Sequence, residues 1–198
     1  QEDRRMSGQE HASVDLDTVE NTRFIGPEFL VWLWFKSELF GSELDVEGFG
    51  TIEVWLDTQL VLESQIDSGE RTTLKGMAPS GSPEALTAMK QGKMPIRARI
   101  QLNHGKLNFS FTFDAVSFAI SNLKIPAVVE EGDEVFYERM LLVEQLDQII
   151  GALYTEYLTL RVSPLWEGEL APAMRDWVQG ETELTVRAYN GMLKRAGA

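Results

Sequence analysis

Hydrophobic and polar residues alternate with a period of two over residues 95 to 113, in two segments separated by a turn signal at residues 103 to 105. Successive side chains of a β-strand point to opposite faces, so this pattern predicts a β-hairpin. The face expected on the core carries the apolar positions Ile96, Ala98, Ile100, Leu102, Leu107, Phe109, Phe111 and Phe113. The other face is expected toward solvent.

The segments before the hairpin alternate between helical and strand patterns. An apolar helix is predicted from Gly26 to Phe40, with Pro27 in its first turn. Strands are predicted over 51–57 and 59–64, joined by a tight turn at Asp57 and Thr58, and over 71–76. A short helix follows, with Ser82 as N-cap and Gly92 at its end.

A long helix over residues 134–163 is the strongest helical signal after the hairpin. Its apolar residues at 136, 140, 143, 146, 150, 153 and 157 recur every three or four positions, and further apolar residues widen the stripe. So wide a stripe is expected to pack across the sheet and also against the first helix or another subunit. Pro164 ends this helix. A strand is predicted over 116–123 and a second helix over 170–178.

The order of these elements is typical of an α+β domain. We expect an antiparallel β-sheet packed on one face by the long C-terminal helix and the apolar N-terminal helix. The domain is expected over residues 23–180. Polar residues 1–22 predict a flexible tail, and 181–198 predict a C-terminal tail.

The chain offers little catalytic or metal-binding chemistry. Its 198 residues include no cysteine, which excludes disulfides and thiolate sites. The two histidines, His11 and His104, are expected to face solvent. Carboxylates at Glu130, Glu131, Asp133 and Glu134 are better explained by the positive end of the following helix than by a metal. With no nucleotide-binding or hydrolase motif present, the sequence predicts no enzyme, cofactor or metal.

The sequence also lacks the features of a membrane or exported protein. No apolar run is long enough to span a bilayer, and the first residues lack the basic-then-apolar plan of a signal peptide. A cytoplasmic protein without a membrane partner is therefore expected.

Positive charge gathers in the middle of an acidic chain. The formal net charge is −13, yet residues 51–125 hold 8 Lys and Arg against 7 Asp and Glu. The solvent face of the hairpin carries cations, amides and hydroxyls and no carboxylate of its own. This inventory is typical of a surface that binds an anion, although a merely solvated sheet face remains the alternative. The candidate residues are Arg97, Arg99, Lys106, Asn108 and Ser110, with Lys90 and Lys93 just upstream.

Four segments together resemble the RdgC family of bacterial recombination-associated proteins. They are FIGPEFLVWLWFKSE at 24–38, SGSPEALTAMKQGK at 80–93, the aromatic hairpin, and residues 134–166. The resemblance is to the C-terminal part of that family, is closest to its shorter, divergent members, and covers roughly residues 24–178. We expect no counterpart here of the N-terminal portion that helps to close a ring in full-length members.

The resemblance implies a non-enzymatic α+β protein that binds DNA without sequence preference, forms a dimer, and restrains the RecA recombinase. The expected partners are therefore the DNA backbone, other copies of the chain in a homo-oligomer such as a dimer, and a recombinase. The broad apolar stripe and the acidic charge leave a second hypothesis open, a structural or adaptor subunit that assembles without DNA. A third, a metal-dependent nuclease, would need carboxylates near the basic face.

Overall fold

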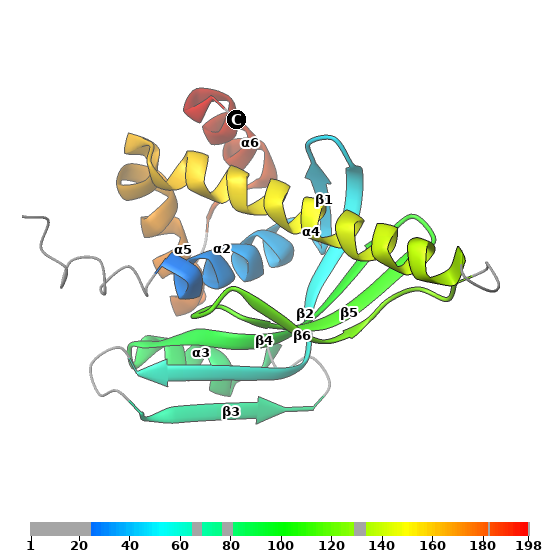
Figure 1. Ribbon diagram of the computed structural model, residues 1–198. Coiled ribbons are helices and arrows are strands. Elements are labelled where there is room, and N and C mark those ends of the chain that lie inside the picture. Colours follow the sequence, from blue (N-terminus) through cyan, green and yellow to red (C-terminus); the bar gives the residue numbers. More distant parts are fainter. Residues whose placement is uncertain (1–24, 65–68, 77–80, 129–133, 182, 198) are drawn as a thin grey trace, which may run out of the picture.

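One six-stranded antiparallel β-sheet carries the helices over one of its faces (Figure 1). The computed structural model describes residues 25–64, 69–76, 81–128, 134–181 and 183–197. The strands are β1 (Glu43–Val46), β2 (Gly50–Ser64), β3 (Arg71–Lys75), β4 (Lys93–His104), β5 (Leu107–Asp114) and β6 (Ala119–Lys124). The helices are α2 (Ile25–Leu39), α3 (Pro83–Lys90), α4 (Glu134–Arg161), α5 (Ala171–Gln179) and α6 (Val186–Ala196), with a π-helical turn at Trp166–Leu170. The predicted α+β class is confirmed.

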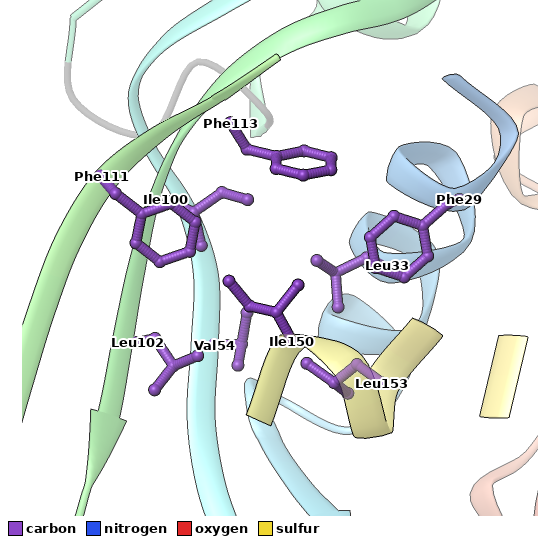
Figure 2. A pocket seen from close by; sticks show the side chains of 9 residues that line it. All are labelled: Phe29, Leu33, Val54, Ile100, Leu102, Phe111, Phe113, Ile150 and Leu153. Atoms are coloured by element: carbon purple, nitrogen blue, oxygen red, sulfur yellow. The ribbon is translucent and has the colours of Figure 1, made fainter. Parts of the chain in front are cut away.

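The strand order is β1-β2-β4-β5-β6, and β3 pairs with the second half of β2. The predicted hairpin is the pair β4–β5, in which Ile100 lies opposite Phe111 and Leu102 opposite Phe109. Its apolar face lies on the core as expected. Figure 2 shows these side chains converging with those of α2 and α4 around a cavity of about 10 Å³. The nine lining residues are all apolar, so this cavity is a dry packing defect and not a binding site.

Helix α2 is buried nearly all round, which explains why its sequence shows no polar face. It contacts the sheet on one side and α4 and α5 on others. Its start approaches the β5–β6 turn so closely that only a glycine fits at position 26, because a Cβ there would lie 1.7 Å from the Ala115 carbonyl oxygen. Contact of this kind fixes the helix against the sheet.

The short helix α3 begins as its sequence predicts. Ser82 has extended backbone dihedrals, and its Oγ accepts a hydrogen bond from the backbone N–H of Ala85 at 3.3 Å. Pro83 occupies the first helical position. Ala85 and Ala88 then face the core, which places the end of α3 next to α5.

One local prediction is wrong, and the bounds of another element differ from those predicted. The expected turn at Asp57 and Thr58 does not exist, because β2 continues through it as one 15-residue strand. An irregularity in its pairing with β4, between Leu56 and Leu60, absorbs the residues that resembled a turn. The strand predicted over 116–123 is present as β6, but it starts later, at Ala119, and ends at Lys124.

Helix α4 is present as predicted, but only the second half of the predicted stripe is buried. The residues that face the core are Leu142, Leu146, Ile149, Leu153, Tyr157 and Leu160. Phe136, Met140 and Val143, which were expected inside, are exposed. Leu146, Leu153 and Tyr157 of the predicted stripe are buried, and contact with the sheet, α2 and α6 involves this second half of the helix.

The sequence predicts a tail over residues 181–198, but α6 occupies most of this segment. Thr185 caps it by accepting a hydrogen bond from the Ala188 N–H, and Tyr189 and Met192 are buried. Its apolar residues Val186, Tyr189, Met192 and Leu193 recur at helical spacing, a pattern that the sequence analysis did not use, and the helix packs against α4. The predicted tail over 1–22 lies outside the described residues. No helix within the described ranges has the length and apolar content to cross a membrane.

Candidate nucleic-acid interface

The sheet face opposite the helices, here called the open face, presents polar side chains from adjacent strands. Strand pairing aligns Arg97 of β4 with Asp114 of β5, Arg99 with Thr112, and Gln101 with Ser110. On the outer side Ser110 is paired with Lys124 of β6. On the other side of β4, β2 and β3 continue the face with Gln59, Glu63, Val61, Arg71, Thr73 and Lys75.

The two arginines of β4 are placed on the open face as predicted. Arg97 is exposed, and its Nη2 and Nε lie 2.5 Å and 3.1 Å from Oδ2 of Asp114. Burial pushes the pKa of the Asp114 carboxyl upward, but hydrogen bonds from Arg97 and Ser117 outweigh it and hold that pKa below its ordinary value. Arg99 is half-buried and donates to the backbone carbonyl of Asn122 at 2.9 Å. Arg97 is thus already committed to an anion, whereas Arg99 is held by a neutral acceptor.

The open face is less positive than the hairpin sequence alone indicates. β2 places Asp57 and Glu53 beside β4, where their carboxylates accept hydrogen bonds from Gln101 at 2.8 Å and from Asn103 at 2.9 Å. With Asp114, these groups correct the expectation of a surface without carboxylates. Strand order is set by contacts far apart in the sequence, so the pattern of the hairpin could not reveal its neighbours.

Lys90 and Lys93 do not belong to the open face. Lys93 is only 8% exposed and points to the helix-covered side, where its Nζ lies 2.7 Å from Oε1 of Glu70 and 3.0 Å from Oγ1 of Thr72. Lys90 lies at the end of α3, and its Nζ is 3.4 Å from the carbonyl oxygen of Gln179. The prediction that both lysines extend the hairpin site is therefore wrong.

The remaining candidates keep their expected places. Lys106 lies in the exposed β4–β5 turn, Asn108 is exposed and Ser110 is half-buried on the open face. Thr112, expected toward solvent, is buried between its neighbours. Within the described ranges no carboxylate contacts Arg99, Lys106 or Lys124. The sequence analysis missed Lys124, Lys75 and Arg71, because only sheet order brings β6 and β3 alongside the hairpin.

A buried polar cluster between α2, α4 and α6 is the most unusual electrostatic feature. Lys36 is 2% exposed, and its Nζ lies 2.5 Å from Oε2 of Glu156. Tyr189 donates its hydroxyl to Oε1 of Glu156 at 3.1 Å and accepts from Nε1 of Trp32 at 2.9 Å. Burial lowers the pKa of the Lys36 ammonium, and the carboxylates of Glu156 and Asp45 oppose part of that shift.

A second cluster joins the start of α2 to the end of α4. Oε2 of Glu28 accepts from the Tyr157 hydroxyl at 2.9 Å and from Nε of Arg161 at 2.7 Å. Burial beside Glu28 raises the pKa of the Tyr157 hydroxyl. In each of the two clusters the polar side chains form hydrogen bonds with one another, an arrangement typical of groups that fix the relative positions of helices.

His104 is not solvent-facing as expected. Its Nε2 lies 3.0 Å from the Phe49 carbonyl oxygen, and its Nδ1 lies 2.9 Å from Nε2 of Gln145. These contacts connect the β1–β2 turn to α4, a structural role. The described residues contain no group of three or more acidic or histidine side chains that could hold a metal. Of the acidic residues considered at the start of α4, only Glu134 lies within the described ranges.

The chain matches no protein-family model, no curated protein and no solved structure.

Proposed function

We propose that this chain is a non-enzymatic protein that binds the DNA backbone without sequence preference, acting as an oligomer associated with recombination. The observation that carries the proposal is the open face, on which Arg99 and Lys124 lie free of carboxylate contacts among the described residues. Hydroxyl and amide donors at Ser110 and Asn108 lie beside them. Such donors contact phosphates without reading bases.

The dimensions of the open face suit a backbone. From β3 to β6 the face crosses five neighbouring strands, or about 19 Å at the usual strand spacing. Phosphates of one DNA strand follow one another every ~3.4 Å along the helix axis, so several can meet this width. The carboxylates of Glu53, Asp57 and Asp114 reduce its positive potential, and we therefore expect one copy to bind weakly and several aligned copies to bind well.

Reversing the charges of Arg99 and Lys124 tests this site. Arg99→Glu with Lys124→Glu is expected to weaken duplex binding at least tenfold. The slope of log affinity against log salt concentration should become less steep by about 2, roughly one for each lost phosphate contact. Fluorescence anisotropy of a labelled duplex over a salt series measures both quantities. The equal charge change Lys90→Glu with Arg175→Glu, away from the open face, is the control. A folded Arg99 and Lys124 variant with unchanged affinity and slope would remove the open face from consideration.

A second candidate function is self-assembly, and it is favoured by the first half of α4. Phe136, Tyr137 and Leu141 are 63%, 68% and 64% exposed, and Met140 and Val143 are exposed beside them. These five side chains present on the order of 500 Å² of apolar surface, a size at which an exposed patch is often functional. A symmetric pair would bury about twice that, which reaches the ~1,000 Å² that a specific interface needs as a minimum.

We expect Met140→Glu with Leu141→Glu to convert a dimer into a monomer. The two side chains are exposed, so the unfolding midpoint should stay within a few degrees of the parent value. Light scattering at micromolar concentration measures the mass, and Gln148→Glu, an exposed position on the same helix, serves as the control. A parent chain that is already monomeric at that concentration contradicts the assembly function.

A further inference from the structure

Lys90 and Lys93, displaced from the predicted DNA site, lie instead on a groove between α3, α5 and the start of β4. The groove encloses about 460 Å³. We call it the methionine groove, because Met89, Met94 and Met174 line it together with Val31 and Val178. Methionine side chains are flexible and polarizable, and they adapt to apolar groups of different shapes. The volume is within the range of ordinary ligand sites.

The rim of the methionine groove is positive in a strongly acidic chain. Lys90 and Arg175 are exposed on it, and within the described residues neither contacts a carboxylate. Lys93 also lines the groove, with its charge met by Glu70. The carboxylate that lines the groove, Glu28, accepts hydrogen bonds from Tyr157 and Arg161, which compensate its charge. An apolar floor with two cations at its edge that contact no carboxylate among the described residues is therefore complementary to a ligand with apolar and anionic parts.

We propose that the methionine groove docks an acidic amphipathic peptide segment of a partner protein. One or two bulky apolar side chains of the peptide enter the floor formed by Met89, Met94 and Met174, and neighbouring carboxylates pair with Lys90 and Arg175. Charge complementarity selects this occupant. A DNA backbone, by contrast, has no apolar group that would fill the floor.

This site is separate from the DNA-binding proposal and does not rest on it. Lys90 and Arg175 belong to α3 and α5 on the helix-covered side, whereas Arg99 and Lys124 lie on the open face. The same two double variants can therefore test both sites, each serving as the control for the other.

The experiment measures fluorescence anisotropy of a labelled, carboxy-amidated hexapeptide of three aspartates followed by two leucines and a phenylalanine. Saturable binding to the full chain is expected, and Lys90→Glu with Arg175→Glu should weaken it at least tenfold. Arg99→Glu with Lys124→Glu should leave it unchanged. A peptide with lysines for the aspartates, and one with serines for the three apolar residues, should each lose binding.

Four results would overturn the docking proposal. They are no binding of the acidic peptide by the parent chain, equal weakening by both double variants, full binding of the serine peptide, and loss of duplex binding in the Lys90 and Arg175 variant. The second and third would reveal unspecific charge attraction, and the fourth would assign the rim to DNA. Failure of the open-face variant to affect DNA, with peptide binding intact, would reject the DNA site and leave the groove standing.

Discussion

Replacing Glu156 by leucine is expected to lower the free energy of unfolding by about 3–5 kcal/mol, the cost typical of leaving a buried charge without its partner. Lys36 is almost completely buried, and Glu156 is the carboxylate that its ammonium contacts. The rings of Trp32, Phe40 and Tyr189 surround the ammonium at 5.2–5.9 Å and cannot replace a full negative charge. The variant also removes the acceptor of the Tyr189 hydroxyl, which anchors α6.

Urea unfolding of the variant and of the parent chain measures this difference. Glu144→Gln, at an exposed position of the same helix, is expected to change stability by less than about 0.5 kcal/mol. Adding Lys36→Met to Glu156→Leu should recover most of the loss, because the buried charge itself is then gone. A loss below about 1 kcal/mol in the single variant would show that Lys36 reaches solvent and that the cluster does not hold α6.

The second large effect is expected from the smallest substitution, Gly26→Ala. The added Cβ would lie 1.7 Å from the Ala115 carbonyl oxygen and 2.9 Å from Cε2 of Phe118. The first contact is with backbone, so relief requires α2 to move away from the β5–β6 turn. We expect a loss of about 3 kcal/mol or more, at the upper end of overpacking effects.

Thermal or urea unfolding provides the measurement, and Gly151 provides a matched control. It lies within α4, is exposed, and would meet nothing within 4 Å if a Cβ were added. Gly151→Ala is therefore expected to raise stability by roughly 0.5–1 kcal/mol through helix propensity. If Gly26→Ala unfolds like the parent chain, the close approach of α2 to the sheet is not as described.

Local patterns predicted those parts of the fold in which neighbours in sequence decide the outcome. The two-residue period of the hairpin placed Ile100, Phe111 and Phe113 correctly on the core, since each alternate side chain of a strand must face the same way. Ser82 was identifiable as a cap because a cap satisfies backbone groups only three residues away.

Contacts between distant segments explain what the sequence did not reveal. Asp57 and Gln101 are 44 residues apart, so only strand order shows that a carboxylate lies beside the predicted cationic face. Tyr189 and Glu156 are 33 residues apart on different helices, so the pattern of α6 alone does not indicate their contact. The direction of Lys93 followed from an irregular pairing of β4 with β2 near Val61, which the alternation of β4 alone does not show.

Binding of a labelled duplex at several salt concentrations tests the central claim, that the open face holds a DNA backbone, most directly. Three or four phosphate contacts predict that log affinity falls with log salt at a slope of roughly −3 to −4. Two duplexes of unrelated sequence should bind equally, because the donors at Arg99, Lys124 and Ser110 contact phosphates and not bases. No binding at low salt, or an affinity that does not change with salt, would contradict the account.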